Sequence, residues 1–127
     1  MWRDFYVYVD ELQSFATLAL ANMLSELRKY RVGFTIAHQY LQQVSPEIRH
    51  AVLGNIGAIV SFRVGMVDAP YLAIEFEDEF DQMDFIRLAN YRAYIKLMID
   101  GTPSKPFSAA TLARSPLSYL RRHCGSV

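Results

Sequence analysis

Apolar runs and helical spacings alternate along the chain. Residues 5–9 are β-branched and aromatic without interruption, and this run stops abruptly at Asp10 and Glu11. Such a run predicts a strand that is covered on both faces, as in a parallel sheet. Over residues 17–30 the apolar positions recur every three or four residues, with polar positions between them, which predicts an amphipathic helix.

The alternation continues to residue 111. We expect further strands at 34–37, 58–62, 91–99 and 105–111, and further helices at 45–54, 68–76, 81–88 and 115–122. Ser45 before Pro46 is typical of a helix start, and Asp100 before Gly101 is typical of a hairpin turn. Strands alternating with helices predict an α/β fold, with a mainly parallel sheet, helices on both faces and an antiparallel hairpin near the C-terminus.

Polar residues follow three of the expected strands where each strand ends. Asp10 and Glu11 follow the first, His38 and Gln39 close the second, and Arg63 ends the third. The carboxyl ends of parallel strands meet at one edge of a sheet, and ligands bind there in open α/β sheets. We therefore expect these polar side chains to surround a ligand site.

Asp10 and Glu11, placed after an apolar strand, look like the Walker B element of P-loop ATPases. In that element the first carboxylate holds the Mg²⁺ of Mg-ATP through water, and the second orients the attacking water. Asp10 would then bind the metal and Glu11 would be catalytic. An equally good interpretation of the pair alone is that it caps the following helix.

The order of the later segments makes the resemblance more specific. The Asp-Glu strand, a helix ending in Glu-Leu-Arg-Lys-Tyr at 26–30 and the segment Gly-Phe-Thr-Ile-Ala-His-Gln at 33–39 resemble the HerA–FtsK family of pumping ATPases. The likeness is greatest to type IV secretion coupling proteins and related conjugative-transfer ATPases. Segments 55–63, 91–97 and 106–108 are similar to later parts of such domains, so the resemblance covers roughly residues 5–111.

This resemblance implies a partial RecA-like P-loop fold. Residues 1–113 would form the C-terminal half of the motor domain, and residues 114–127 a basic tail. Gln39 would sense the γ-phosphate, and Arg63 would act on a neighbouring subunit's nucleotide as an arginine finger. Arg49 competes for that role, and surface salt bridging is the alternative for Arg63. The complete protein would couple ATP hydrolysis to the movement of DNA or protein through a hexameric ring.

The phosphate-binding loop of the family is missing from these 127 residues. That loop needs Gly-x-x-x-x-Gly-Lys followed by Ser or Thr, so that backbone amides cradle the phosphates and lysine reaches their oxygens. No Gly-Lys pair occurs in the sequence. We therefore expect a fragment, or a degenerate or split gene product, that neither binds nor hydrolyses ATP alone. Mg-ATP is expected only once the missing N-terminal half completes the domain.

The missing loop also has a structural consequence. In the sheet order that the resemblance implies, the phosphate-loop strand lies between the strands at 5–9 and 34–37. Their inner edges would then be unpaired, which favours a strand-exchanged dimer or a rearranged sheet. The rival interpretation of the whole chain is a non-catalytic α/β interaction module that binds a partner through exposed sheet edges.

The amino-acid composition limits which binding partners and which cellular compartment we expect. Thirteen basic residues balance thirteen acidic ones, so no basic excess indicates nucleic-acid binding, and DNA is expected only as a partner of the full assembly. The single Cys124 allows no disulfide framework, and no stretch reaches the ~20 apolar residues of a membrane span. No signal-peptide pattern opens the chain. The expected location is cytosolic, at the inner face of the membrane through the full protein.

The remaining candidate sites are weaker. The three histidines do not occur at metal-ligand spacing, and the serines lack the context of a nucleophile elbow. Residues 75–84 hold six carboxylates without the spacing of a calcium loop, so a solvated segment with Phe76, Phe80 and Phe85 packed beneath it is expected. A C-terminal patch could touch DNA in the full assembly or remain a solvated tail; it comprises Arg114, Tyr119, Arg121 and Arg122.

Overall fold

The computed structural model describes residues 3–77 and 79–112. Along these residues the elements are β1 Phe5–Val9, α1 Leu18–Leu27, β2 Val32–Ile36, α2 Pro46–Asn55, β3 Ile59–Ser61, α3 Ala69–Glu75, α4 Gln82–Arg87, β4 Arg92–Lys96, β5 Met98–Ile99, β6 Thr102–Pro103 and β7 Phe107–Ala110. Short 3₁₀ turns at Leu12–Ser14, Arg28–Tyr30 and Leu41–Gln43 follow β1, α1 and β2. The expected helix at 115–122 and the basic tail lie outside the described residues.

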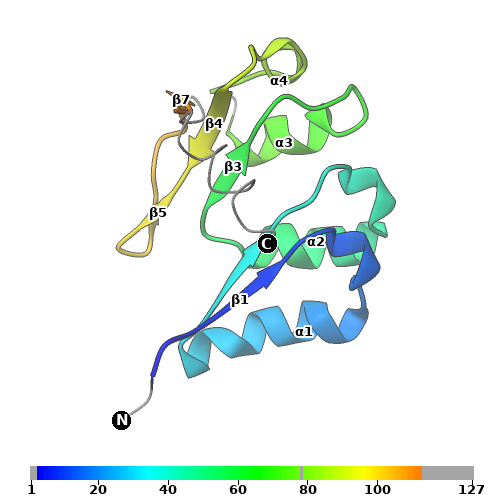
Figure 1. Cartoon of the computed structure of the whole chain (residues 1–127), viewed down its shortest axis with the longest axis vertical. Coiled ribbons are helices and arrows are strands. Elements are labelled where there is room, and N and C mark those ends of the chain that lie inside the picture. Colours follow the sequence, from blue (N-terminus) through cyan, green and yellow to red (C-terminus); the bar gives the residue numbers. More distant parts are fainter. Residues whose placement is uncertain (1–2, 78, 113–127) are drawn as a thin grey trace, which may run out of the picture.

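The first half of the chain is a βαβ unit followed by a second helix (Figure 1). Strands β1 and β2 pair in parallel, from Phe5 opposite Val32 to Val9 opposite Ile36. The inner edges of these strands, expected to be unpaired, are hydrogen-bonded to each other, so the sheet is rearranged relative to the order that the resemblance implies. Their outer edges have no strand partner among the described residues.

The second half of the chain forms antiparallel sheets. Strand β4 lies between β3 and β7 and pairs with both in the antiparallel sense, and β5 and β6 form a short hairpin. The expectation of a mainly parallel sheet is wrong for the described residues, in which β1 and β2 are the parallel pair. The reason is that β3 takes its partner from the strand that returns after α3 and α4, and not from β2. The fold is mixed α/β with small sheets.

Helices cover one face of the β1–β2 pair. Leu24 of α1 and Val52 of α2 belong to one buried cluster, against which Phe34 and Ile36 of β2 pack; its buried members are Leu12, Leu24, Val44, Ile48 and Val52. The opposite face of β1 carries Tyr6, whose ring would lie 3.0 Å from a Cβ atom at position 33. Glycine there lets the ring approach the backbone of β2 closely. Helices on both faces were expected, whereas the helices in the described ranges cover one face of this strand pair.

A second cluster fills the space between α3, α4 and the antiparallel sheet. Phe76 and Phe85 are fully buried, with ring centroids 5.2 Å apart in an edge-to-face arrangement, and Phe80 stacks on Tyr94 at 3.8 Å. Edge-to-face pairs add about 0.5–1.5 kcal/mol to the burial of each ring. The prediction that Phe76, Phe80 and Phe85 pack as apolar side chains is confirmed.

Two buried charged side chains join the two halves. The Asp68 carboxylate is 3% exposed and accepts hydrogen bonds from the backbone N–H groups of Leu41 and Gln42, both at 3.1 Å. Arg49 is 8% exposed, lies 3.9 Å from the centre of the Tyr71 ring and donates to the Leu41 carbonyl at 3.4 Å. These contacts commit Arg49 to holding the turn after β2. The arginine-finger alternative for Arg49 stays a prediction.

Within the described ranges, the longest helices, α1 and α2, have ten residues each, and none of the helices is long and apolar enough to cross a membrane.

Candidate functional site

Glu11 occupies a special backbone position directly after β1. Its φ of 55° and ψ of 62° place it in the left-handed region, which costs a residue other than glycine roughly 1–2 kcal/mol. Its backbone N–H donates to the Asp10 carboxylate at 2.9 Å. The left-handed turn redirects the chain into the 3₁₀ turn Leu12–Ser14, so the pair does not cap a long helix. A strained residue at a strand end is typical of functional sites.

The Glu11 carboxylate is held by two side-chain amides. Gln39 Nε2 donates to Glu11 Oε1 at 3.3 Å, and Gln13 Nε2 donates to Glu11 Oε2 at 2.5 Å. Because β1 and β2 are parallel neighbours, Gln39 reaches Glu11 from a position 28 residues later in the chain. The structure thus brings together two of the residues expected at the site. A carboxylate oxygen accepts more than one hydrogen bond, so each oxygen can still accept one from water.

Gln13 was not identified from the sequence. Its only signal is its position two residues after Glu11, where the left-handed backbone of Glu11 turns the next residues back toward the carboxylate. That conformation cannot be predicted for a glutamate from its residue type, because such geometry favours glycine and asparagine. Gln13 therefore completes the pair of amides that hold the Glu11 carboxylate. Of this pair, only Gln39 could be expected from the strand pattern.

Asp10 precedes Glu11 and is exposed, and its carboxylate accepts a hydrogen bond from the backbone N–H of Glu11. Mg²⁺ usually keeps several waters and takes only one or two protein carboxylates. Asp10 can fill that role as a single ligand. In the part of the chain that the structure describes, no three His, Cys, Asp or Glu side chains come together to form a metal site. A metal held here would therefore depend on waters and on phosphate oxygens.

Three buried polar atoms at this end of the sheet have no hydrogen-bond partner among the described residues. They are Gln13 Oε1 and both ring nitrogens of His38. Leaving a buried polar atom unsatisfied costs about 1–3 kcal/mol, so such atoms are normally paired. His38 precedes Gln39, and Gln13 contacts Glu11. The strand ends therefore present polar atoms that still require partners.

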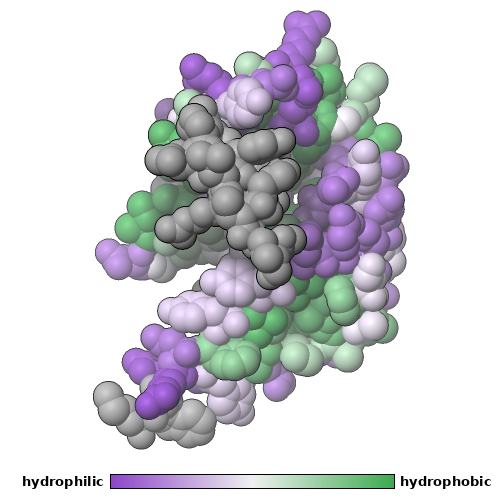
Figure 2. All heavy atoms as spheres, in the orientation of Figure 1, coloured by the Kyte–Doolittle hydropathy of each residue, from purple (hydrophilic) through white to green (hydrophobic). Residues whose placement is uncertain are grey.

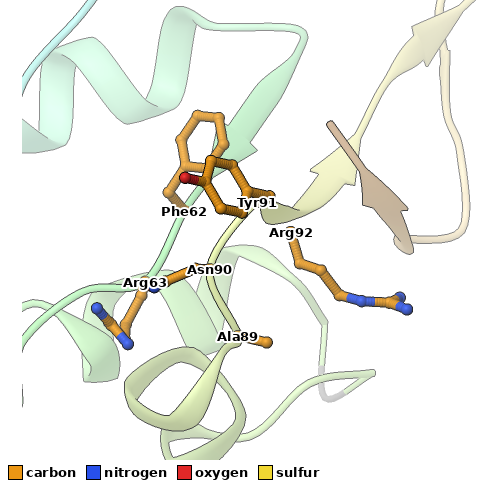
Figure 3. Close-up of a pocket in the computed structure, with 6 residues that line it drawn as sticks. All are labelled: Phe62, Arg63, Ala89, Asn90, Tyr91 and Arg92. Carbon is orange, nitrogen blue, oxygen red and sulfur yellow. The ribbon is translucent and has the colours of Figure 1, made fainter. Parts of the chain in front are cut away.

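Arg63 lies elsewhere, just after β3. It is exposed and lines a hollow of about 370 Å³ (Figure 3) together with Phe62, Ala89, Asn90, Tyr91 and Arg92. Within the described ranges it forms no hydrogen bond or ion pair with Glu11 or Gln39. The candidate site is thus divided into a carboxylate–amide cluster at β1 and β2 and a separate arginine at β3.

Comparison of the chain with models of known protein families and with curated protein sequences finds no match.

Proposed function

We propose that this chain supplies the Walker B and sensor residues of a DNA-translocating, conjugative-transfer type ATPase. The observation that carries the proposal is the 3.3 Å hydrogen bond from Gln39 to Glu11, which links the ends of two parallel strands. A water-activating carboxylate and a γ-phosphate sensor must face the same phosphate, and this contact places the two side chains together. The resemblance described above is the second support.

In this proposal each side chain has one role. Asp10 holds Mg²⁺ through water, Glu11 accepts a hydrogen bond from the attacking water, and Gln39 moves from Glu11 to the γ-phosphate when nucleotide is present. Mg-ATP supplies the phosphoryl group to be hydrolysed. Arg63 acts on the nucleotide of a neighbouring subunit in a hexameric ring, at the cytosolic face of the membrane.

The phosphate loop comes from a polypeptide segment outside these 127 residues. The pairing of β1 with β2 leaves no place for a phosphate-loop strand between them, so the added segment would have to join an outer edge, such as the edge of β2 that has no strand partner among the described residues. The buried polar atoms of His38 and Gln13 that have no hydrogen-bond partner among the described residues lie at the same end of the β1–β2 pair. An added segment at this end could supply those partners. The chain alone is proposed to be inactive.

The test is to supply a segment with the Gly-Lys-Thr or Gly-Lys-Ser motif in trans and to measure ATP hydrolysis. Activity should appear in the mixture, and Glu11→Gln should reduce its rate by about 10²- to 10⁴-fold, because it removes the group that activates water. Glu26→Gln, an exposed glutamate on α1, is the matched control and should keep full activity. Unchanged activity of the Glu11→Gln mixture would refute the role of Glu11.

A second candidate function is a non-catalytic module that binds a partner through its sheet. Exposed aromatic residues on β1 favour it, since Tyr6 and Tyr8 are 64% and 75% exposed. Stable partner binding that Tyr8→Ala weakens and that no nucleotide affects in any mixture would favour this module over the ATPase.

A further inference from the structure

Gln39 lies in the middle of a short segment that is fixed at both ends. The segment leads from β2 to the next 3₁₀ turn and reaches α3 of the second half (Figure 1). At its first end, the backbone N–H of Ala37 donates to the Val9 carbonyl at 2.8 Å. At its second end, the backbone N–H of Leu41 donates to the Asp68 carboxylate at 3.1 Å. Gln39 is two residues from each end, so both ends decide where its side chain lies.

Little else holds this segment among the described residues. The Gln39 side chain is exposed, and within the described ranges its one hydrogen bond is the 3.3 Å contact with Glu11. The backbone groups of residues 38 and 39 make no hydrogen bond with any part of the chain that the structure describes. Fixing a backbone conformation costs conformational entropy, so a segment held only at its ends becomes free to move when one end is released.

The second end depends on a helix-start residue that does not serve its own helix. Asp68 directly precedes α3, where an aspartate normally accepts a hydrogen bond from the first turn of its helix. Its side chain makes no such hydrogen bond. Both oxygens instead accept from the turn after β2, Oδ2 from Leu41 and Oδ1 from Gln42, which lie 27 and 26 residues earlier. Asp68 is 3% exposed, and an ionised acceptor makes a stronger hydrogen bond than a neutral one. The carboxylate thus stabilises the turn rather than α3.

The second half holds Leu41 in two further ways. The Leu41 carbonyl accepts from the Arg49 guanidinium at 3.4 Å, and Arg49 lies over the ring of Tyr71 on α3. The Leu41 side chain packs against the buried cluster between α3, α4 and the antiparallel sheet. By its packing and hydrogen bonds Leu41 therefore belongs to the second half, although it precedes α2 in the chain.

We propose that Asp68 is a positioning residue for the Gln39 side chain. By holding the turn two residues after Gln39, it keeps the amide at the Glu11 carboxylate. The start of α3 thereby sets the geometry of a site that is built on β1 and β2. This inference rests on the proposed function for the chemical role of Gln39, but the placement of Gln39 can be tested without ATP.

The first test measures NMR relaxation of the backbone amide nitrogens in the full chain. In the wild-type chain the order parameter of Gln39 should be about 0.85, as in β1. Asp68→Asn keeps the size of the side chain but offers the two backbone N–H groups only one acceptor oxygen. The order parameter of Gln39 should then fall below about 0.6, the range of a flexible backbone, while β1 and α2 stay at about 0.85.

Asp81→Asn is the matched control, because Asp81 also precedes a helix of the second half. Unlike Asp68, it caps its own helix, α4, by accepting from the Asp84 backbone N–H at 2.9 Å. Asparagine caps helices about as well as aspartate does. This variant should leave the order parameter of Gln39 unchanged.

The second test uses the reconstituted ATPase mixture and separates positioning from a general loss of structure. Asp68→Asn should lower kcat by about 10²-fold, because a misplacement of about 1 Å is enough for such a loss. The KM for ATP should stay the same, since the proposed phosphate loop lies outside these 127 residues. In a Gln39→Ala chain, Asp68→Asn should have no further effect on kcat, because the residue that it positions has lost its amide.

Three results would overturn the proposal. The first is an order parameter of Gln39 below about 0.6 in the wild-type chain, which can be measured even if Asp68→Asn does not fold. The second is a folded Asp68→Asn variant in which that order parameter equals the wild-type value. The third is an equal loss of kcat from Asp68→Asn with and without the Gln39 amide. If no mixture hydrolyses ATP, the proposed function fails, and the relaxation measurements still decide whether Asp68 positions Gln39.

Discussion

The two halves of this protein are packed to different degrees. Around α3 and α4, the rings of Phe76 and Phe85 are fully buried and contact each other. On β1, in contrast, Tyr6 and Tyr8 lie on a face that none of the described helices covers. Figure 2 shows hydrophobic and weakly polar residues over the part of the visible face where α1 lies in Figure 1.

Their polar groups differ in the same way. Lys96, in the second half, donates from its ammonium group to the Glu75 carbonyl and to the Glu77 carboxylate, both at 2.7 Å. In the first half, His38 and Gln13 leave buried polar atoms without partners among the described residues. The comparison teaches that each half has its own buried apolar cluster, but that the buried polar atoms without a partner among the described residues lie in the first half, where a further segment can satisfy them.

The variant with the largest expected effect tests whether side chains are packed more tightly around α3 and α4 than on β1. Phe85→Ala should lower the free energy of unfolding by about 3–5 kcal/mol, because it removes a fully buried ring and leaves a cavity between α3, α4 and β4. Phe5→Ala on β1 is the matched control, since Phe5 is largely exposed. It should cost less than about 1 kcal/mol. Urea unfolding followed by circular dichroism measures both, and equal losses would contradict the contrast between the halves.

A smaller effect tests how the halves are joined. Asp68→Ala leaves the backbone N–H groups of Leu41 and Gln42 without their acceptor and should cost about 2–3 kcal/mol. It should also broaden or split the unfolding transition, because the carboxylate links the turn after β2 to the start of α3. Asp4→Ala is the control, since Asp4 only pairs with Arg31 at 3.9 Å on the surface, and should cost less than about 1 kcal/mol.

If Asp68→Ala unfolds in one sharp transition at the native midpoint, this carboxylate does not hold the halves together. Hydrogen exchange adds a second measurement. Faster exchange confined to the backbone amides of residues 41 and 42 would mean that the turn opens locally while both clusters stay intact.

Local patterns predicted the elements of this fold well. The apolar run at residues 5–9 is β1, the three- and four-residue spacing at 17–30 is α1 with its 3₁₀ extension, and Ser45 before Pro46 begins α2. These features depend on a few neighbouring residues. The location of Glu11 and Gln39 at one edge of the sheet also followed, because the carboxyl ends of parallel strands meet there. Their direct contact did not follow, because the resemblance implies a further strand between the two.

Pairing between distant strands was not predictable in this way. The run at 58–62 suggested a buried parallel strand, but β3 has three residues and pairs with β4 in the antiparallel sense. A short apolar run does not encode the direction of its partner. The burial of Arg49 was likewise not predictable from the sequence. Arginine is normally exposed, and the burial of this one is explained by its position over the Tyr71 ring. The left-handed Tyr91 had no sequence signal, since glycine and asparagine mark such turns.

The smallest expected effect concerns pH and the second half alone. Burial, and then the nearby carboxylates of Asp84 and Asp81, raise the pKa of the Tyr94 hydroxyl above its ordinary value of 10.0. The unfolded chain therefore loses this proton at lower pH than the folded chain does. Above pH 10 the folded state binds more protons than the unfolded state, so stability should fall as pH rises through the folded pKa.

Tyr94→Phe keeps the stack on Phe80 and removes the ionisable group, so it should reduce this alkaline loss of stability while leaving the neutral-pH stability nearly unchanged. Tyr8→Phe, on the exposed face of β1, is the control and should leave the alkaline profile as it is. Thermal unfolding between neutral pH and pH 11 measures the difference. A profile that Tyr94→Phe and Tyr8→Phe change equally would mean that the exposed face of β1 responds to alkali as strongly as the packed half, which contradicts the comparison.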